Sequence, residues 1–347
     1  MADFPTTTPT ELIQQIFSWI PPNQNIAFQR ISKRIHSCLS SAHFALMNLE
    51  TLLHSGLSTT QPRNKGITRK YPLEILARDL HEFDRSFFVW PAAYQTALVE
   101  LRYKHLVDLF WPTLRIEGKI PAAIGGMKEL MNLSMRDNRI VGSIPIEIGM
   151  LQKLTVLEFP RNALTGPIPK EIGDMVNLQY ISLNQNSLSG PLPSEIGNLS
   201  NLITLYLGGN KLSGPIPESL GNCTRLERLH LNTNQFSGLL PKTLENLTNL
   251  TELLLQSNQL TGPILEEFTR FRDLEMLDLT RNGFIGKIPR GFQALGNVRG
   301  GNLRTFYVAD GNAGLEWTEH EADGFVLAIR KCDLIAADWS ARNGARR

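Results

Sequence analysis

Apolar residues recur with a period of 24 along the chain between residues 106 and 297. The repeated unit restarts at Leu106, Leu130, Leu154, Leu178, Leu202, Leu226, Leu250 and Leu274. Each unit opens with the pattern L-x-x-L-x-L, in which apolar and polar positions alternate, and this alternation predicts a short strand with one buried face. A fixed period in this range is typical of solenoids, where each unit buries its apolar side against its neighbours. The eight units therefore predict one continuous core.

An asparagine follows the strand in all units except the first. These residues are Asn138, Asn162, Asn186, Asn210, Asn234, Asn258 and Asn282. A side-chain amide offers two donors and an acceptor, so it can satisfy backbone groups that are freed where a coil turns a corner. We expect the asparagines to form a buried structural ladder. Further along each unit, a glycine and an Ile-Pro pair predict a tight turn followed by an extended segment.

The repeat, with its x-Gly-x-Ile-Pro element, resembles the plant-type, 24-residue leucine-rich repeat over residues 106–297. The resemblance implies an α/β solenoid with short parallel strands on its concave face and an irregular or 3-10 convex side. An all-α helical region is expected on the N-terminal side. The chain departs from the pattern in three units. Leu114 replaces the asparagine of the first, Pro160 occupies a strand position of the third, and Ile264-Leu265 replaces Ile-Pro in the seventh.

The polar positions between the inward leucines are expected on the concave face, where a partner would bind. They are Arg136, Asp137, Glu158, Arg161, Tyr180, Asn184, Gln185, Tyr206, Arg228, His230, Asn232, Glu252, Gln256, Asp278 and Arg281. Both charge signs occur among them, and the two tyrosines lie beside the small Gly208-Gly209 pair. This composition favours a protein or peptide partner. Nucleic acid would favour a basic stripe, which a net charge of +2 over 347 residues does not provide. The simpler alternative is that these are ordinary solvated strand positions.

Residues 5–54 show helical spacing of apolar positions and resemble an F-box. The resemblance is carried by Pro9-Thr-Glu-Leu-Ile-x-x-Ile-Phe-x-x-Ile-Pro21, by Ile31-Ser-Lys-Arg34 and by Ala42-His-Phe44. It implies docking on the Skp adaptor of a cullin–RING ubiquitin ligase through Pro9, Leu12, Ile13, Ile16, Phe17, Ile20 and Pro21. The segment lacks the leading leucine, the tryptophan and the Asp-Pro pair of the F-box pattern. The alternative is a helical cap in which the same residues form an intramolecular core.

The remaining segments are interpreted as connections and caps. Residues 55–71 are polar and rich in turn formers, which indicates a linker. Residues 72–105 resume helical spacing and are expected to form an N-terminal cap, with Trp90, Trp111 and Phe87-Phe88 sealing the first repeat. Residues 298–347 are expected to hold a decayed repeat and a C-terminal cap or tail, in which Asn302 and Leu303 begin an incomplete ninth unit.

No catalytic motif is visible, so we expect no enzyme, no cofactor and no metal site. The three cysteines Cys38, Cys223 and Cys332 are too far apart for a metal motif, and their odd number offers no disulfide framework. The sequence contains neither a signal-peptide pattern nor a long apolar run, which predicts a cytoplasmic or nuclear protein without a membrane segment.

These observations lead to a non-enzymatic protein–protein interaction protein. The first hypothesis is an F-box-type substrate receptor that binds a Skp adaptor with its N-terminal helices and a client protein on the concave face. The second is a leucine-rich repeat scaffold with no ubiquitin-ligase role. A third is a receptor-ectodomain-like fragment, favoured only by five N-x-S/T sequons at Asn132, Asn198, Asn222, Asn246 and Asn249.

Overall fold

The computed structural model describes residues 74–75, 88, 92–289, 291–295, 302–308 and 310–316. The F-box-like segment 5–54, the linker 55–71 and most of the C-terminal segment 298–347 lie outside the described residues. The chain divides into two compact units, Met1–Leu154 and Thr155–Arg347, which are taken in turn.

The N-terminal unit combines a short helical segment with the first two repeats. Its elements are β1 (Glu74–Ile75), α6 (Ala92–Leu98), the π-helix η3 (Val99–Tyr103), β2 (Asp108–Phe110), β3 (Glu117–Lys119), the 3-10 helix η4 (Ala122–Gly126), β4 (Asn132–Ser134), β5 (Arg139–Gly142) and η5 (Ile146–Met150). Strand β1 pairs in parallel with β2, β2 with β4, and β3 with β5. Helix α6 and η3 lie in the region expected to be helical. Within the same region, the backbone of the two-residue strand β1 pairs with the groups that β2 exposes along its edge.

Aromatic packing closes the interior of this unit at the first repeat. Trp111 is fully buried, and its ring meets Phe88 edge to face at 5.9 Å and Tyr103 at 6.0 Å. Such edge contacts add to the stabilisation that burial of the rings provides. The first repeat has no ladder asparagine of its own. Instead, the Oδ1 atom of Asn138, in the next repeat, accepts hydrogen bonds from the backbone N–H groups of Leu114 and Ile116, each at 3.0 Å.

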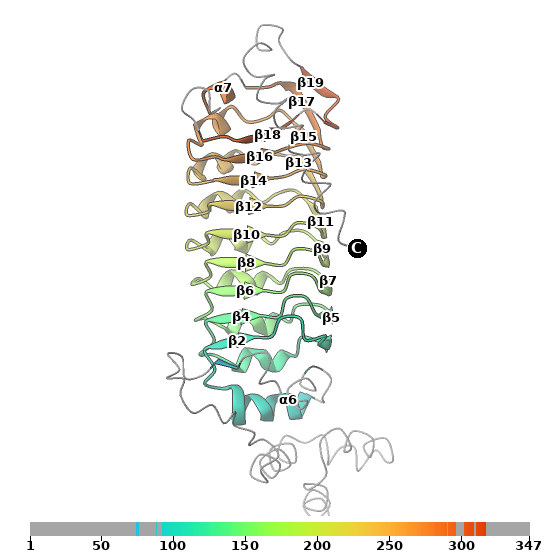
Figure 1. Cartoon of the computed structure of the whole chain (residues 1–347), viewed down its shortest axis with the longest axis vertical. Coiled ribbons are helices and arrows are strands. Elements are labelled where there is room, and N and C mark those ends of the chain that lie inside the picture. Colours follow the sequence, from blue (N-terminus) through green and yellow to red (C-terminus); the bar gives the residue numbers. More distant parts are fainter. Residues whose placement is uncertain are drawn as a thin grey trace, which may run out of the picture. The chain divides into compact units, whose positions relative to one another are not determined.

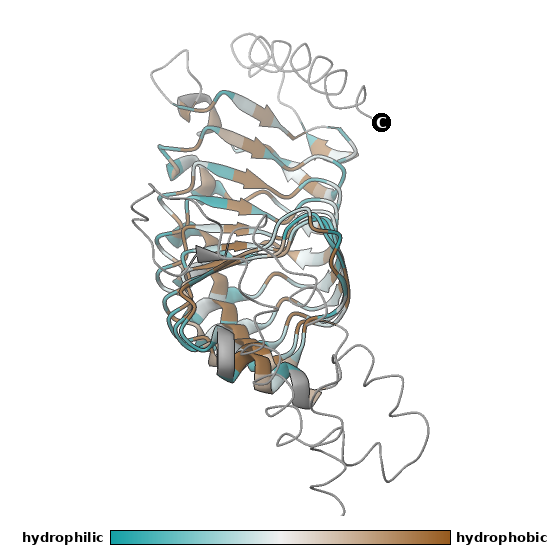
Figure 2. Cartoon of the chain, turned by 60° about the horizontal axis from the view of Figure 1, so that its bottom comes forward, coloured by the Kyte–Doolittle hydropathy of each residue, from teal (hydrophilic) through white to brown (hydrophobic). Residues whose placement is uncertain are grey.

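The main sheet of the C-terminal unit contains one short strand from each repeat. Its strands are β6 (Val156–Glu158), β8 (Tyr180–Ser182), β10 (Thr204–Tyr206), β12 (Arg228–His230), β14 (Glu252–Leu254), β16 (Met276–Asp278) and β18 (Thr305–Tyr307), parallel and in sequence order (Figure 1). The register follows the sequence period, since Leu205 pairs with Leu229 and Leu229 with Leu253, residues that are 24 apart. The central residue of each strand is buried, which gives the alternation of hydrophobic and hydrophilic positions visible in Figure 2.

A second parallel sheet forms where the sequence indicated only a turn and an extended segment. It contains β7 (Ala163–Gly166), β9 (Ser187–Gly190), β11 (Lys211–Gly214), β13 (Gln235–Leu239), β15 (Gln259–Gly262), β17 (Gly283–Lys287) and β19 (Gly314–Glu316). Most of these strands end at a glycine with a positive φ, such as Gly214 at 78°, a conformation that other residues adopt at a cost. The expected solenoid of short parallel strands with a 3-10 side is confirmed, and this second sheet accompanies the 3-10 helices.

The remaining side of each coil is helical. It consists of the 3-10 helices η6 (Lys170–Asp174), η7 (Ser194–Asn198), η8 (Glu218–Asn222), η9 (Lys242–Asn246) and η10 (Glu266–Arg270), followed by the helix α7 (Phe292–Leu295). A proline in extended conformation precedes η6 to η9, and Leu265 adopts a similar conformation before η10. The coils approach closely here. A Cβ atom on Gly197 would lie 2.3 Å from the carbonyl oxygen of Ser219 in the next coil, so this position requires glycine.

The C-terminal unit contains a ninth repeat that the sequence only hinted at. Strand β18 pairs with β16 and β19 with β17, and Leu303, Phe306 and Val308 are buried in the spacing of the other repeats. Its ladder asparagine is Asn312, displaced by one residue from the expected position. The pattern Leu303-x-x-Phe306-x-Val308 was the signal for this unit, but Leu303 follows Leu274 by 29 residues instead of 24 (303 − 274), which breaks the period. The repeats therefore continue past residue 297.

Candidate functional site

The ladder asparagines are saturated with backbone hydrogen bonds. Asn210 illustrates the arrangement, because its Oδ1 accepts from the N–H of Leu188 at 3.0 Å and its Nδ2 donates to the carbonyls of Leu183 and Leu207 at 3.0 and 2.9 Å. The same pattern recurs at Asn186, Asn234, Asn258 and Asn282, and at Asn312 in the ninth repeat. Asn138 makes the equivalent bonds in the N-terminal unit, and Asn162 donates to the carbonyls of Phe159 and Pro160. These carboxamides bond the backbone of successive coils, so their role is structural.

A second set of side chains also links successive coils, and sequence reasoning missed it. The Nδ2 atom of Asn201 donates to the carbonyl of Val176 at 3.1 Å, and Asn249 donates to Thr224 at 2.8 Å. The signal was the asparagine that directly precedes the leading leucine in several units. These residues hold coils together and are not available for recognition.

The expected binding residues fall into two positions of the coil. The first group belongs to strands of the main sheet and comprises Glu158, Tyr180, Tyr206, Arg228, His230, Glu252 and Asp278. The second group follows the strands and comprises Arg161, Asn184, Gln185, Asn232, Gln256 and Arg281. In the N-terminal unit, Arg136 and Asp137 also follow a strand, and the Arg136 guanidinium lies 5.8 Å from the centre of the Phe110 ring.

The turn before each ladder asparagine has a left-handed backbone. Arg161, Gln185 and Arg281 have φ between 53° and 56°, and Thr233 adopts 54° although it is β-branched. Residues other than glycine rarely take this conformation. These residues therefore sit at the corner of the coil, where the chain turns from the strand towards the ladder asparagine.

Aromatic residues from three consecutive strands form a continuous row, here called the aromatic row: Tyr180, Tyr206 and His230. The ring of Tyr206 meets Tyr180 edge to face at 5.8 Å and stacks on His230 at 4.2 Å with an interplanar angle of 23°. The row ends in an acid, because His230 Nε2 lies 2.7 Å from Oε2 of Glu252. The other carboxylate oxygen of Glu252 lies 3.4 Å from Nε of Arg228. All five side chains are half-buried, so each presents part of its surface to solvent.

The surroundings of the row keep it electrically neutral at neutral pH. Burial lowers the pKa of His230 and outweighs the opposing effect of Glu252, so the imidazole is uncharged. Burial also raises the pKa of Tyr206, and the nearby negative charge of Glu252 raises it further. The negative charge of Glu252 is balanced by Arg228. The row therefore offers a partner a half-buried, uncharged aromatic surface.

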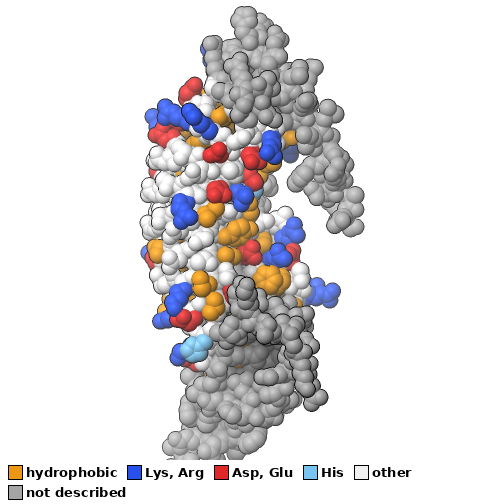
Figure 3. Space-filling model, turned by 60° about the vertical axis from the view of Figure 1, so that its left-hand side comes forward, with side chains coloured by type: hydrophobic (Ala, Val, Ile, Leu, Met, Phe, Trp, Pro, Cys, Tyr) orange, Lys and Arg blue, Asp and Glu red, His pale blue; other side chains and the backbone are white. Residues whose placement is uncertain are grey.

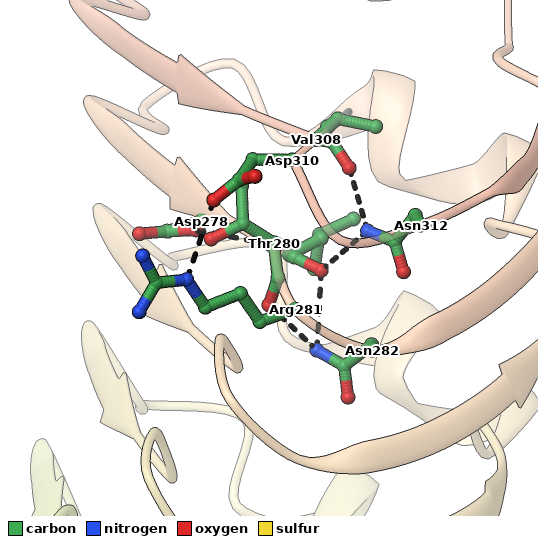
Figure 4. Close-up of polar contacts among 8 residues, drawn as sticks. Asp278, Thr280, Arg281, Asn282, Val308, Asp310 and Asn312 are labelled. Carbon is green, nitrogen blue, oxygen red and sulfur yellow. Dashed lines mark hydrogen bonds and ion pairs between the residues drawn. The ribbon is translucent and has the colours of Figure 1, made fainter.

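Polar groups pair with one another in the last two repeats of the main sheet, around β16 and β18 (Figure 4). The Asp278 carboxylate accepts hydrogen bonds from the backbone N–H of Thr280 at 3.0 Å and from its hydroxyl at 2.6 Å. Burial raises the pKa of Asp278 despite these bonds. Arg281 Nε donates to Asp310 Oδ2 at 3.3 Å. Both charge signs also alternate on the side of the molecule shown in Figure 3, where no single-sign patch dominates.

The described residues contain no group of three or more His, Cys, Asp or Glu side chains that could hold a metal ion. Across the same residues, no helix has the length and hydrophobicity needed to span a membrane. Cys223 is buried with its Sγ 3.3 Å from the carbonyl oxygen of Ile196, and burial raises its thiol pKa to about 11. Cys38 and Cys332 lie outside the described residues.

Comparisons with known proteins agree with this geometry. The family model "Leucine-rich repeat region" matches residues 164–288, and no curated protein matches the chain. Among solved structures, the plant peptide hormone receptor RGFR1 in complex with RGF2 is 35% identical, with a TM-score of 0.58, over 61% of this chain and 33% of the receptor chain. The ectodomain of the Arabidopsis thaliana receptor kinase GASSHO1/SCHENGEN3, in complex with CASPARIAN STRIP INTEGRITY FACTOR 2, is 36% identical with a TM-score of 0.56.

That second match covers 58% of this chain and 24% of the receptor ectodomain, so this chain spans at most about a third of the length of either plant protein. A leucine-rich repeat protein of Leptospira interrogans is 25% identical with a TM-score of 0.50, over 68% of this chain and 67% of that one. The fold of the described residues, with its asparagine ladder, is therefore that of a leucine-rich repeat solenoid.

Proposed function

We propose that this protein recognises an extended peptide, or an extended segment of a protein, on the concave face of its C-terminal unit. The observation that carries the proposal is the aromatic row, in which Tyr206 is stacked on His230 and edge-on to Tyr180. One of the similar solved structures is a plant peptide hormone receptor in complex with RGF2, which supports a peptide as the kind of partner. The chain spans only part of those receptors, so nothing about their signalling is carried over.

The energetics favour the aromatic row as the centre of the contact. Tyrosine is enriched among the few residues that dominate protein interfaces, because it buries a large surface and loses little conformational entropy. Tyr206 and His230 already restrict each other by stacking, so binding orders them at little further cost. The salt bridge between Arg228 and Glu252 lies beside the row and neutralises the acid. We therefore expect a partner with an uncharged apolar or aromatic side chain at this point.

The test is a selection of linear peptides displayed on phage against the full-length protein, followed by affinity measurements on the synthesised consensus peptide. Tyr206→Ala is expected to weaken binding at least about tenfold, as for an interface residue that contributes more than about 1.4 kcal/mol. Thr165→Ala is the matched control, because Thr165 is an exposed residue of the second sheet. The proposal fails if no peptide is enriched, or if Tyr206→Ala and Thr165→Ala bind the peptide equally well.

A ubiquitin-ligase role is a separate proposal that rests on the sequence of residues 5–54 alone, since these lie outside the described residues. It predicts that the full-length protein captures a purified Skp adaptor and that an Ile16→Asp, Phe17→Asp double variant does not. Capture by both proteins, or by neither, would reject the adaptor role. The concave face keeps its proposed role in either case, because its test does not involve these residues.

The cellular compartment is also a matter for experiment. The sequence prediction is cytoplasmic or nuclear, whereas a receptor-like protein would act outside the cell. All five sequon asparagines are exposed, and the side-chain amides of Asn198, Asn222 and Asn246 make no hydrogen bond within the described residues, so these three could accept a glycan in the secretory pathway. A shift in gel mobility on glycosidase treatment of the protein from its natural source would reject the prediction, and an unchanged mobility would support it.

A further inference from the structure

The carboxamide of Asn232 lies directly over Gly208, one coil away on the same face. A Cβ atom on Gly208 would lie 2.5 Å from Oδ1, 3.1 Å from Cγ and 3.2 Å from Nδ2 of Asn232. Gly208 is buried beneath this side chain, and its backbone is not in the left-handed region. The absence of a side chain at position 208 thus lets the Asn232 amide settle on the backbone of the neighbouring coil, next to the strands of Tyr206 and His230.

The Asn232 carboxamide has no hydrogen-bond partner among the described residues. Other polar side chains at the same position of the coil are paired within the protein: Asn184 Oδ1 accepts from Ser182 at 2.7 Å, and the Thr280 hydroxyl donates to Asp278. Gln256, one coil beyond Asn232, carries a buried Oε1 that also lacks a partner within the described residues. Buried polar atoms are nearly always paired, so the unpaired Oε1 of Gln256 is an exception, whereas the half-exposed Asn232 amide is open to a partner.

Two carboxamides in adjacent coils match the hydrogen-bonding groups of an extended main chain. The Asn232 amide offers both donors and an acceptor to a peptide group, and Gln256 offers the donors of its Nε2, since its Oε1 is buried. Neighbouring parallel strands are about 4.8 Å apart, so the coils of Tyr206, Asn232 and Gln256 span about 10 Å, which is the length of about three extended residues. A nucleic acid would instead need cationic groups here, and Arg228, which lies beside the row, already pairs with Glu252.

We infer that the partner is an extended peptide held through its main chain by Asn232 and Gln256, while one uncharged side chain packs on Tyr206 and His230. The inference rests on the proposed function and specifies its chemistry. Main-chain pairing fixes the direction and register of the peptide, and the aromatic row selects the side chain. Sequence preference is therefore expected at one peptide position, with tolerance at the neighbouring positions.

The experiment combines variants of the protein with N-methylation of the selected peptide, which removes one backbone N–H at a time. Asn232→Ala is expected to weaken binding at least tenfold. Gly208→Ala is expected to weaken binding as much although residue 232 is still asparagine, because the new Cβ displaces the end of the flexible Asn232 side chain. N-methylation at one peptide position should cost at least tenfold against the wild-type protein and less than threefold against Asn232→Ala.

Far-ultraviolet circular dichroism and thermal melting confirm that each variant is folded, and Thr165→Ala again serves as the control. If Tyr206→Ala abolishes binding while Asn232→Ala and Gly208→Ala bind normally, recognition is by side chains alone and this inference is overturned, whereas the proposed function stands. If N-methylation weakens binding equally for the wild type and Asn232→Ala, the pairing with Asn232 is rejected. If Tyr206→Ala binds the peptide as tightly as the Thr165→Ala control, the proposed function itself is rejected.

Discussion

Asn232 and Asn234 carry the same functional group two positions apart, yet the protein uses the two side chains in opposite ways. Asn234 is buried, accepts from the N–H of Leu212, and donates to the carbonyls of Leu207 and Leu231. Asn232 lies on the face of the sheet, over Gly208, with no partner for its amide within the described residues. The carboxamide itself does not determine the role. Its position in the 24-residue period does, because the ladder position points into the coil and the earlier one points out.

This difference separates stability from recognition along the whole array. The ladder position is occupied by asparagine in every described repeat of the C-terminal unit, because the same backbone groups must be satisfied in each coil. The position two residues before the ladder asparagine varies, with Asn184, Gly208, Asn232, Gln256 and Thr280 in consecutive units. Variants at the first position should therefore affect folding, whereas variants at the second should affect binding.

The largest effect is expected from removal of a ladder asparagine. Asn210→Ala leaves the N–H of Leu188 and the carbonyls of Leu183 and Leu207 without their partner. Unsatisfied buried groups are costly, so the free energy of unfolding should fall by about 3 kcal/mol. Asn232→Ala should change it by less than about 0.5 kcal/mol, as for a surface residue. Urea unfolding of both variants checks this, and equal losses of stability would contradict the division between the two positions.

A smaller effect is expected where two coils approach each other. Gly197→Ala places a Cβ atom 2.3 Å from a backbone carbonyl, which cannot move without separating the coils, and should destabilise the protein by about 1–3 kcal/mol. Gly208→Ala meets only the end of a side chain, so its cost should stay below about 0.5 kcal/mol. Thermal melting compares the two variants. A similar drop in melting temperature would show that Asn232 is held rigidly in place.

Gln256→Met should make the protein more stable and less able to bind. The substitution keeps the length of the side chain and removes an acceptor that is buried without a donor. The free energy of unfolding should rise by about 1 kcal/mol, since the cost of the unsatisfied group is lost. Affinity for the selected peptide should fall in the same variant. Urea unfolding and peptide titration measure the two quantities, and a variant that is destabilised and binds normally would contradict the assigned role.

The smallest effect is a dependence of stability on pH at the aromatic row. Burial holds the pKa of His230 below 6.5 in the folded protein, so the unfolded chain takes up this proton at higher pH than the native protein does. Above pH 6.5 His230 is neutral in both states and the free energy of unfolding does not depend on its titration. As the pH falls below 6.5 the unfolded chain binds this proton first, so the free energy of unfolding decreases. Asp278, whose pKa is raised by burial, acts in the opposite sense at lower pH. The difference between wild type and His230→Gln at pH 7.5 and 5.5 isolates the histidine. An identical difference at both pH values would contradict the prediction.

Much of the fold could be predicted because the repeat imposes the same constraint many times. The leucine period indicated the strands of the main sheet and their register, and the asparagines marked the corners. The second sheet was missed, because segments such as Lys211–Gly214 are too short to show a period of their own. The ninth repeat was hinted at but not recognised as complete, because its first leucine, Leu303, lies 29 residues after Leu274 (303 − 274) and one further residue precedes Asn312.

The candidate site could be predicted as a set of positions but not as an arrangement. Alternation along each strand shows which side chains leave the core, and it placed Tyr180, Tyr206 and His230 on one face. It does not show which neighbours they contact, since those come from other coils, about 24 residues away. The stacking of Tyr206 on His230 and the position of Glu252 between His230 and Arg228 arise only when the coils stack.

The sequence by itself determined the repeat, its buried leucines and the asparagines at its corners, because these follow from a period and from the need to satisfy every buried backbone group. Only the tertiary structure decided which exposed polar groups are paired and which are left open. Asn184 and Asn232 occupy the same position of the repeat, and one is bound to Ser182 while the other rests on Gly208. The physical reason is that hydrogen bonding at the surface depends on distances between coils, which the period of a single chain does not contain.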